Sequence, residues 1–423
     1  MLIKLALKSL RNRKGSIVLS IMAMTVSIFV LLGVEHIRHQ TKESFSNTVS
    51  GVDLIVGART GSLNLLLYSV FKIGSPTNNM SWESFEKIKA NTKVKWAIPL
   101  SLGDSHKGYR VLGTTPDYFQ YFSYGKQHNL VLAKGKAFEH VFDVVLGAQV
   151  ASKLGYKIGD HIVLTHGISK TSFNTHKDNP FTIVGILAPT GTPVDQTLHV
   201  SLQSIEAIHI NWQSVSQYQK ISPDQVITQE LQQKTLHDKL QPKSITAFML
   251  GLHSKMATFR LQREINDYTQ EPLLAILPGV ALSELWQMMT ILENTLLLVS
   301  ILVFVSACLG VSAMLLSSIR ERTREIQLLR VIGASPLFLF LLIELEALFI
   351  TIVSITLGLG LLTLSLFSAQ EYLVAYFGLH ISTNTISIEN LYLLLSILCA
   401  SIIVAMIPSI ISYIQSKNHT LRH

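Results

Sequence analysis

Four apolar runs divide this 423-residue chain, and each is long enough to form a helix that crosses a membrane. The hydrocarbon core of a bilayer is about 30 Å thick, so a helix needs about 20 mainly apolar residues to span it. A cleaved signal peptide is the alternative interpretation of the first run, because basic residues precede it. That run is long for a signal peptide and no A-x-A-like cleavage pattern follows it. The pattern therefore favours four spans, at residues 16–34, 291–316, 337–367 and 391–411.

Lysine and arginine are concentrated in three of the segments that flank these spans. Five precede the first span, four lie between Arg320 and Arg330, and two follow the fourth span. Short segments rich in these residues stay on the cytoplasmic side of a membrane. Residues 35–290 and 368–390 are then expected on the opposite side. The predicted cytoplasmic segments are residues 1–15, 317–336 and 412–423.

The long segment between the first two spans contains many short runs of the β type. Residues 35–49 continue the first span as a polar helix and predict a stalk. Residues 81–90 combine a serine N-cap with apolar residues at helical spacing, and a further helix is expected over 255–268. Alternating runs bounded by Gly, Pro and Asp predict strands. These runs lie in residues 51–60, 94–103, 109–115, 143–147, 160–167, 180–191, 197–202 and 244–252.

The predicted fold class is therefore an α+β membrane protein. It has four transmembrane helices and a large mixed α/β domain inserted between the first and the second. The inserted segment is long enough to bury a core of its own.

Composition and charge agree with this division. Hydrophobic residues make up 48% of the chain and the formal net charge is +8. Juxtamembrane cations facing anionic lipid explain much of that charge, and no nucleic-acid-binding module is recognisable. Both cysteines, Cys308 and Cys399, lie inside predicted spans, so disulfides cannot stabilise the inserted domain.

Motifs for catalysis are absent from the sequence. It contains no G-x-x-x-x-G-K-[ST] loop, no G-x-S-x-G elbow and no H-E-x-x-H. The cytoplasmic segments are also too short to hold an ATPase domain. We therefore expect a chain that is not an enzyme and that holds no cofactor of its own.

The segment between the second and third spans combines basic residues with an apolar patch. Basic residues alone would serve as anchors on the cytoplasmic side. An apolar patch beside a charged face also fits a short helix that docks into a groove on a soluble partner. A glycine before Pro336 is the expected end of this helix. The predicted coupling residues are Arg320, Arg322, Arg324, Glu325, Ile326, Leu329, Arg330 and Gly333.

Residues 322–335 read RTREIQLLRVIGAS and resemble the segment between the second and third spans of ABC transporter permeases of the MacB, LolC and FtsX type. The likeness continues into the third span, where Glu346 stands at a position that is usually glutamate in that family. Gln327 departs from the pattern, because the family commonly has glycine there.

The likeness extends to the rest of the chain. Residues 5–33 resemble the basic amphipathic helix and first span of those permeases. Residues 146–164 and 180–187 resemble a MacB-type periplasmic core domain, whereas the likeness is looser over residues 191–283.

This resemblance implies the permease half of a type VII ABC system in a bacterial inner membrane. Such a chain dimerises with a second copy or with a homologous permease, and a separate ABC ATPase subunit binds ATP and Mg²⁺ and drives it. Its cargo would be a lipoprotein, a peptide or another amphiphile. Other expected partners are membrane lipids and a periplasmic adaptor, chaperone or hydrolase. The alternative is an FtsX-like regulator that switches a periplasmic enzyme and transports nothing.

Two carboxylates, Glu344 and Glu346, lie within the third predicted span. Intramembrane carboxylates are candidates for a functional role. They also lie near the cytoplasmic end of the span, where snorkelling or pairing with the basic segment would explain them. Small residues four apart on the second span, Ser306 and Gly310, predict a close-packing face.

Histidines in the inserted domain raise a third possibility, which is metal-linked transport or sensing. Three or four imidazoles that converge can bind zinc or copper. Their spacing matches no closed zinc motif, and scattered surface histidines are the simpler interpretation. The candidate ligands are His161, His166, His176 and His199.

Overall fold

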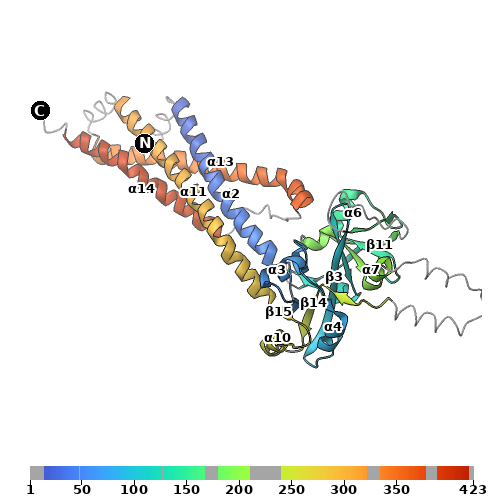
Figure 1. The fold of residues 1–423 in the computed structure, drawn as a ribbon. Coiled ribbons are helices and arrows are strands. Elements are labelled where there is room, and N and C mark those ends of the chain that lie inside the picture. The colour runs from blue at the N-terminus through green and yellow to red at the C-terminus, as the bar shows by residue number, and fades with distance from the viewer. Residues whose placement is uncertain are drawn as a thin grey trace, which may run out of the picture. The chain divides into compact units, whose positions relative to one another are not determined.

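The computed structural model forms two compact units, a helical unit and an α/β domain. The helical unit contains the chain up to Thr41 and most residues from Met289 onward, and the α/β domain contains Lys42–Met288. The structure describes residues 14–46, 48–125, 127–166, 180–209, 240–321, 334–377 and 388–418. Figure 1 shows the long helices of the helical unit and the strands and short helices of the α/β domain.

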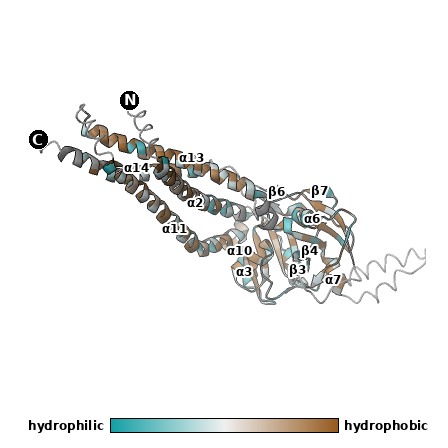
Figure 2. Ribbon diagram, turned by 90° about the horizontal axis from the view of Figure 1, so that it is seen from above, coloured by the Kyte–Doolittle hydropathy of each residue, from teal (hydrophilic) through white to brown (hydrophobic). Residues whose placement is uncertain are grey.

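Four long helices match the four predicted spans. Each is long and apolar enough to cross a membrane, and apolar residues dominate α11 and α13 in Figure 2. Proline opens α11 and α13, as expected for a residue whose missing N–H costs nothing in the first turn. The third helix extends ten residues beyond the end of its predicted span, because residues 368–377 continue it with helix-compatible residues. The helices are α2 (Lys14–Ser46), α11 (Pro278–Glu321), α13 (Pro336–Phe377) and α14 (Ile388–Asn418).

Helix α2 packs closely against α13. A Cβ atom added to Gly358 would lie 3.0 Å from the Ile28 side chain, so this glycine lets the two helices approach. Next to it, the Ser354 hydroxyl donates a hydrogen bond of 3.3 Å to the carbonyl oxygen of Ile21. Small residues on α13 therefore form the contact with α2.

Hydroxyl groups also connect the other neighbouring helices. Thr351 Oγ1 of α13 lies 2.5 Å from Ser401 Oγ of α14. Ser312 of α11 donates a hydrogen bond of 3.3 Å to the carbonyl oxygen of Val404 on α14. The helices are thus connected in the order α2, α13, α14, α11.

The α/β domain is built on a mixed 11-stranded sheet. Its main path runs β15-β1-β14-β3-β4-β12-β8-β11-β7, with β10 paired to β3 and β9 to β11. Most pairs are antiparallel, but β12 with β4 and β11 with β8 are parallel. Each segment predicted as β-type contains at least one strand. The strands of this sheet are β1 (Leu54–Ala58), β3 (Val94–His106), β4 (Tyr109–Thr114), β7 (Leu132–Gly135), β8 (Asp143–Leu146), β9 (His161–Ile162), β10 (Thr165–His166), β11 (Phe181–Leu187), β12 (Thr197–Ser201), β14 (Ala247–Leu252) and β15 (Leu273–Ile276).

Strand β3 joins the two halves of the sheet. Its first part, up to Leu100, pairs with β14, and its second part, from Ser101, pairs with β4. Two further pairs lie apart from the main sheet: β2 (Met80–Ser81) with β13 (Ser244–Ile245), and β5 (Ser123–Tyr124) with β6 (His128–Asn129).

Both faces of the sheet are covered. Side chains alternate along each strand, so neighbouring residues enter different cores. In β1, Leu54 and Val56 belong to one apolar cluster while Ile55 belongs to another. In β12, Leu198 and Val200 enter a third cluster, which also contains Phe181.

Short helices complete these cores. Ser81 caps α4 as predicted, because its hydroxyl accepts a hydrogen bond of 3.3 Å from the Ser84 N–H. Helix α3 continues into a π-helical turn, η1, whose buried residues include Tyr68 and Phe71. The helices are α3 (Ser62–Leu66), η1 (Leu67–Phe71), α4 (Trp82–Lys89), α5 (Asp117–Tyr121), α6 (Ala148–Leu154), η2 (Pro193–Gln196), α7 (Leu202–His209), η4 (Lys255–Ala257) and α10 (Thr258–Asn266).

Candidate functional site

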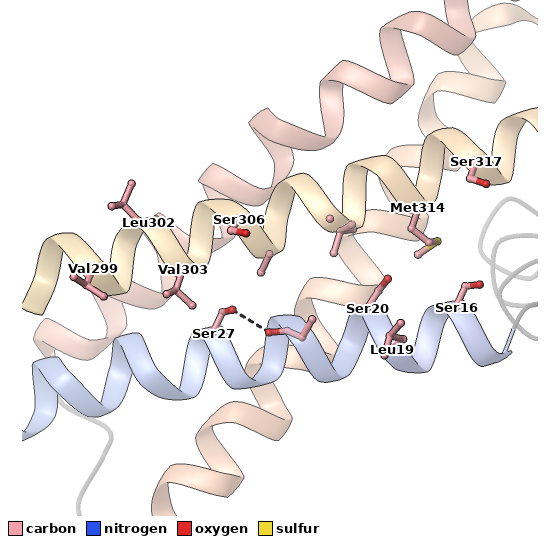
Figure 3. Close-up of a pocket in the computed structure, with 14 residues that line it drawn as sticks. Ser16, Leu19, Ser20, Ser27, Val299, Leu302, Val303, Ser306, Met314 and Ser317 are labelled. Carbon is pink, nitrogen blue, oxygen red and sulfur yellow. Dashed lines mark hydrogen bonds between the residues drawn. The ribbon is translucent and has the colours of Figure 1, made fainter.

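A groove of about 780 Å³ lies between α2 and α11 (Figure 3). The residues that line it are serines or apolar residues, and none carries a charge. Such a lining offers neither a base nor a metal ligand. What it can do is pack against another apolar surface with hydroxyl groups as hydrogen-bonding points.

On α2, small residues form the wall of the groove. Ser16, Ser20, Ala23 and Ser27 line it at spacings of four, three and four residues, which places them on one helix face. Ser27 donates a hydrogen bond of 2.9 Å to the carbonyl oxygen of Ala23, so its hydroxyl is satisfied within its own helix. The spacing of these small residues is the sequence signal by which this face of α2 can be found.

The wall on α11 contains the small residues that the sequence predicted as a close-packing face. Ser306 and Gly310 both line the groove. Among the residues that the structure describes, no atom lies within 4 Å of the position that a Cβ atom on Gly310 would take. Within that part of the chain, this face is therefore not packed against another helix.

Around the groove, α11 carries an unusually exposed apolar surface. Val299 and Leu302 are each more than half exposed, as are Leu19 and Val18 on α2. In water such a surface would be costly. In a bilayer it suits contact with lipid or with a second membrane helix.

Of the eight predicted coupling residues, Arg320 lies within the described residues. It is exposed near the end of α11. The other seven, Arg322, Arg324, Glu325, Ile326, Leu329, Arg330 and Gly333, lie outside the residues that the structure describes.

The two intramembrane carboxylates do not form a pair. They are two residues apart on α13, which places them about 200° apart around the helix. Glu346 is buried at 4% exposure, whereas Glu344 is half-buried and lies near Ser409 of α14. Ser409 directly follows Pro408, the proline inside α14. Glu344 thus contributes to the contact between α13 and α14.

The candidate histidine ligands are distributed over the α/β domain. His161 on β9 is exposed and its Nδ1 lies 3.2 Å from the Thr182 hydroxyl. His166 on β10 pairs with Asp104 of β3 in the sheet register, and His176 lies outside the described residues. Within the part of the chain that the structure describes, no three His, Cys, Asp or Glu side chains gather as a metal site.

His199 occupies a different environment from the other candidates. It is fully buried on β12, and its ring lies 5.3 Å from that of Tyr118 and 5.9 Å from that of Phe119, centroid to centroid. Burial lowers its pKa to about 3, and the nearby Lys72 adds to this effect. His199 is therefore neutral at physiological pH and acts as a core residue.

Lys72 is another strongly perturbed group of the domain. It follows η1 with a left-handed backbone, at φ 59°, and its amine donates a hydrogen bond of 2.5 Å to the carbonyl oxygen of Ser69. Burial of the amine lowers its pKa to about 7, and the positive charge of Arg110 adds to this effect.

Two family models match the chain. The model of the MacB-like periplasmic core domain matches residues 16–236, and that of the FtsX-like permease C-terminal domain matches residues 297–420. A comparison with curated protein sequences gives no match.

Two solved structures are similar to parts of this chain. The periplasmic region of MacB from Actinobacillus actinomycetemcomitans is 9% identical and has a TM-score of 0.34; the match covers 56% of this chain and 94% of that one. The extracellular domain of the noncanonic ABC-type transporter YknZ from Gram-positive bacteria is 11% identical and has a TM-score of 0.29; the match covers 53% of this chain and 98% of that one.

Proposed function

Because this chain belongs to the family of MacB- and FtsX-type ABC transporter permeases, we propose that it transmits the motion of a separate ATPase subunit to its α/β domain. In this mechanotransmission, ATP and Mg²⁺ bind to the partner subunit. The permease lies in a bacterial inner membrane, with its α/β domain on the periplasmic side. The cytoplasmic coupling segment, residues 317–336, receives the motion.

The continuity of α11 is the observation that carries this proposal. Near its start, Ala281 and Leu282 are buried in an apolar cluster of the α/β domain. Near its end lies Arg320, the first of the coupling residues. A helix of 44 residues is about 66 Å long at 1.5 Å per residue. A displacement at one end of such a helix therefore reaches the core of the α/β domain through a single element.

The groove between α2 and α11 supports a second part of the proposal, which is association with a second permease. Small residues allow helix backbones to approach closely in a membrane. The groove combines such residues with an exposed apolar surface on both helices. A second copy of this chain, or a homologous permease, would cover this surface.

The cargo in this proposal is a lipoprotein, a peptide or another amphiphile, taken up on the periplasmic side. A periplasmic adaptor or chaperone would receive it. Family membership supports this part, since no described residue identifies a cargo.

Coupling can be tested by reversing the charge of Glu325 in the reconstituted complex with its ATPase. Glu325→Lys should abolish the stimulation of ATP hydrolysis by the permease, because it places a like charge among the arginines of the docking helix. Lys417→Glu, a charge reversal near the end of α14, serves as the matched control and should leave the stimulation unchanged. Full stimulation in the Glu325→Lys variant would contradict the coupling assignment.

The same complex distinguishes transport from regulation. A transporter should release a lipid-anchored cargo from proteoliposomes in an ATP-dependent manner. An FtsX-like regulator should instead activate a periplasmic hydrolase while releasing no cargo.

A further inference from the structure

Arg38 of α2 lies between two carboxylates. One guanidinium nitrogen is 3.5 Å from Glu35 Oε1, one turn earlier on the same helix. Its Nε is 4.0 Å from Glu293 Oε2, which belongs to α11. All three residues belong to the helical unit. The contact joins helices whose sequence positions differ by 255 residues, and hydropathy gives no sign of it.

An isolated ion pair on a wet surface stabilises little, typically less than about 1 kcal/mol. This one differs in two respects. The side chains of Glu35 and Glu293 are only 22% and 23% exposed. Glu35 also holds the guanidinium from its own helix, so less side-chain entropy is lost when Glu293 binds.

This contact between Arg38 and Glu293 lies beyond one end of the groove between α2 and α11. The groove extends from Ser27 and Val299 toward Ser16 and Ser317, and its lining carries no charge. Arg38 lies beyond Ser27 along α2, on the side away from the coupling segment. The two helices therefore have a charged contact beyond one end of the groove and uncharged, small side chains along its length.

We propose that Glu35, Arg38 and Glu293 form a charge clasp that holds α2 and α11 together beyond one end of the groove. An ion pair sets a distance and a direction, whereas the apolar and serine side chains of the groove can separate or slide at little cost. The clasped ends then move as one body, and the groove widens or narrows at its other end. This second part rests on the proposed function, since the ATPase would supply the motion.

The clasp can be measured in the full chain, in lipid nanodiscs, without any ATPase. In a background with Cys308→Ala and Cys399→Ala, spin labels are attached at Ile37→Cys and Leu292→Cys, two exposed neighbours of the clasp. Electron paramagnetic resonance then gives the distance distribution between α2 and α11. The unmodified clasp should give one narrow distribution.

Reversing the charge of Arg38 should separate α2 and α11 at the clasp. Exchanging the charges of Arg38 and Glu293 should restore the contact. Arg38→Glu should shift the distribution to longer distances and broaden it, because three carboxylates then repel one another. Combining Arg38→Glu with Glu293→Arg restores attraction between the helices and should return the narrow distribution. Lys42→Glu, the same charge change about one turn further along α2, should leave the distribution unchanged.

Two outcomes would overturn the clasp. An unchanged distribution in Arg38→Glu would show that the ion pair does not hold the helices. A distribution that stays broad in the exchanged variant would show that the added charges, and not the lost pairing, cause the change. If Arg38→Glu fails to fold, Arg38→Gln, which removes the positive charge, takes its place and should broaden the distribution. A rise in salt from 0.1 to 1 M, which shortens the screening length from about 10 to 3 Å, should broaden the distribution of the unmodified clasp more than that of Arg38→Gln.

The second part of the proposal, that the groove changes its width at the end away from the clasp, can be measured with the ATPase bound. Labels at Ser20→Cys and Met314→Cys report on the groove, and both residues line it. ATP with vanadate should change this distance while the Ile37–Leu292 distance stays constant. Equal changes at both positions would overturn the second part. Failure of the proposed function would instead be recognised by the absence of ATPase stimulation, which leaves the nanodisc measurement unaffected.

Discussion

The α/β domain closes both faces of its sheet, whereas the helical unit leaves one side of its bundle open. In the domain, Phe181 and Phe248 are fully buried from opposite halves of the sheet. In the helical unit, only 28% of the most apolar part of α11 and of α14 is buried, compared with 44% for α2 and for α13. One unit is complete as a single chain, and the other presents a surface for contact.

The difference reflects the surroundings of each unit. Water drives apolar side chains together, so a domain in water must bury them within itself. Lipid is as apolar as leucine, so membrane helices associate through close packing and hydrogen bonds instead. The hydroxyl contacts from Thr351 to Ser401 and from Ser312 to Val404 are of this second kind. Along the groove, the described residues of α2 and α11 leave small and apolar side chains exposed instead of making such a contact.

Truncating an apolar side chain should affect the two units very differently. Phe248→Ala in the α/β domain should lower its free energy of unfolding by about 3–5 kcal/mol, because it leaves a cavity among fully buried neighbours. Leu302→Ala on the groove side of α11, where the side chain is 59% exposed, should change it by less than about 0.5 kcal/mol. Urea unfolding of the full chain in nanodiscs measures both, with tryptophan fluorescence for the domain and far-ultraviolet circular dichroism for the helical unit. Similar losses in the two variants would contradict the contrast.

The stability of the α/β domain should depend on pH through His199. Its pKa is about 3 in the folded domain and 6.5 for an ordinary histidine, so between these values the unfolded chain binds a proton that the folded chain does not. The free energy of unfolding should therefore fall as the pH drops below 6.5, by up to about 1.4 kcal/mol per pH unit. His199→Leu should remove this contribution to the dependence of the free energy of unfolding on pH. His161→Leu, which replaces an exposed histidine, should retain it, and equal slopes in both variants would refute the prediction.

Removing a hydroxyl contact inside the helical unit should have a small effect. Thr351→Val deletes the hydrogen bond to Ser401 and should destabilise the contact between α13 and α14 by about 0.6 kcal/mol. Thr356→Val, on an exposed position of the same helix whose hydroxyl bonds the Ile352 carbonyl oxygen, is the control. Thermal unfolding in nanodiscs compares them. A loss of several kcal/mol would mean that this contact stabilises the helical unit as strongly as a core residue does in the domain.

Much of the fold could be predicted because its signals are local. Four apolar runs gave the membrane helices, and alternation gave β4, β8, β11 and β12. Strand β15 was missed, because LLAI is a short apolar run without alternation and lies close to the start of α11. The double role of β3 was also not predictable, since its two halves pair with strands far apart in the sequence.

The candidate sites were predicted less completely. Ser306 and Gly310 were identified as a small-residue face, but the structure was needed to place that face along a groove. His199 was proposed as a metal ligand because imidazole is a common ligand, but its fully buried ring lies against Tyr118 and Phe119. Seven of the eight coupling residues lie outside the described residues, so the coupling segment stays a prediction from sequence.

By itself, the sequence determined where the membrane helices and most strands lie and which family the chain belongs to. Hydropathy, residue alternation and family motifs are properties of neighbouring residues, so they can be read without knowing the fold. The tertiary structure decided which faces meet, and with them the groove, the clasp of Arg38 with Glu293 and the burial of His199. Each of these depends on residues that are distant in the chain, and their contact energies exist only after the helices and strands have packed.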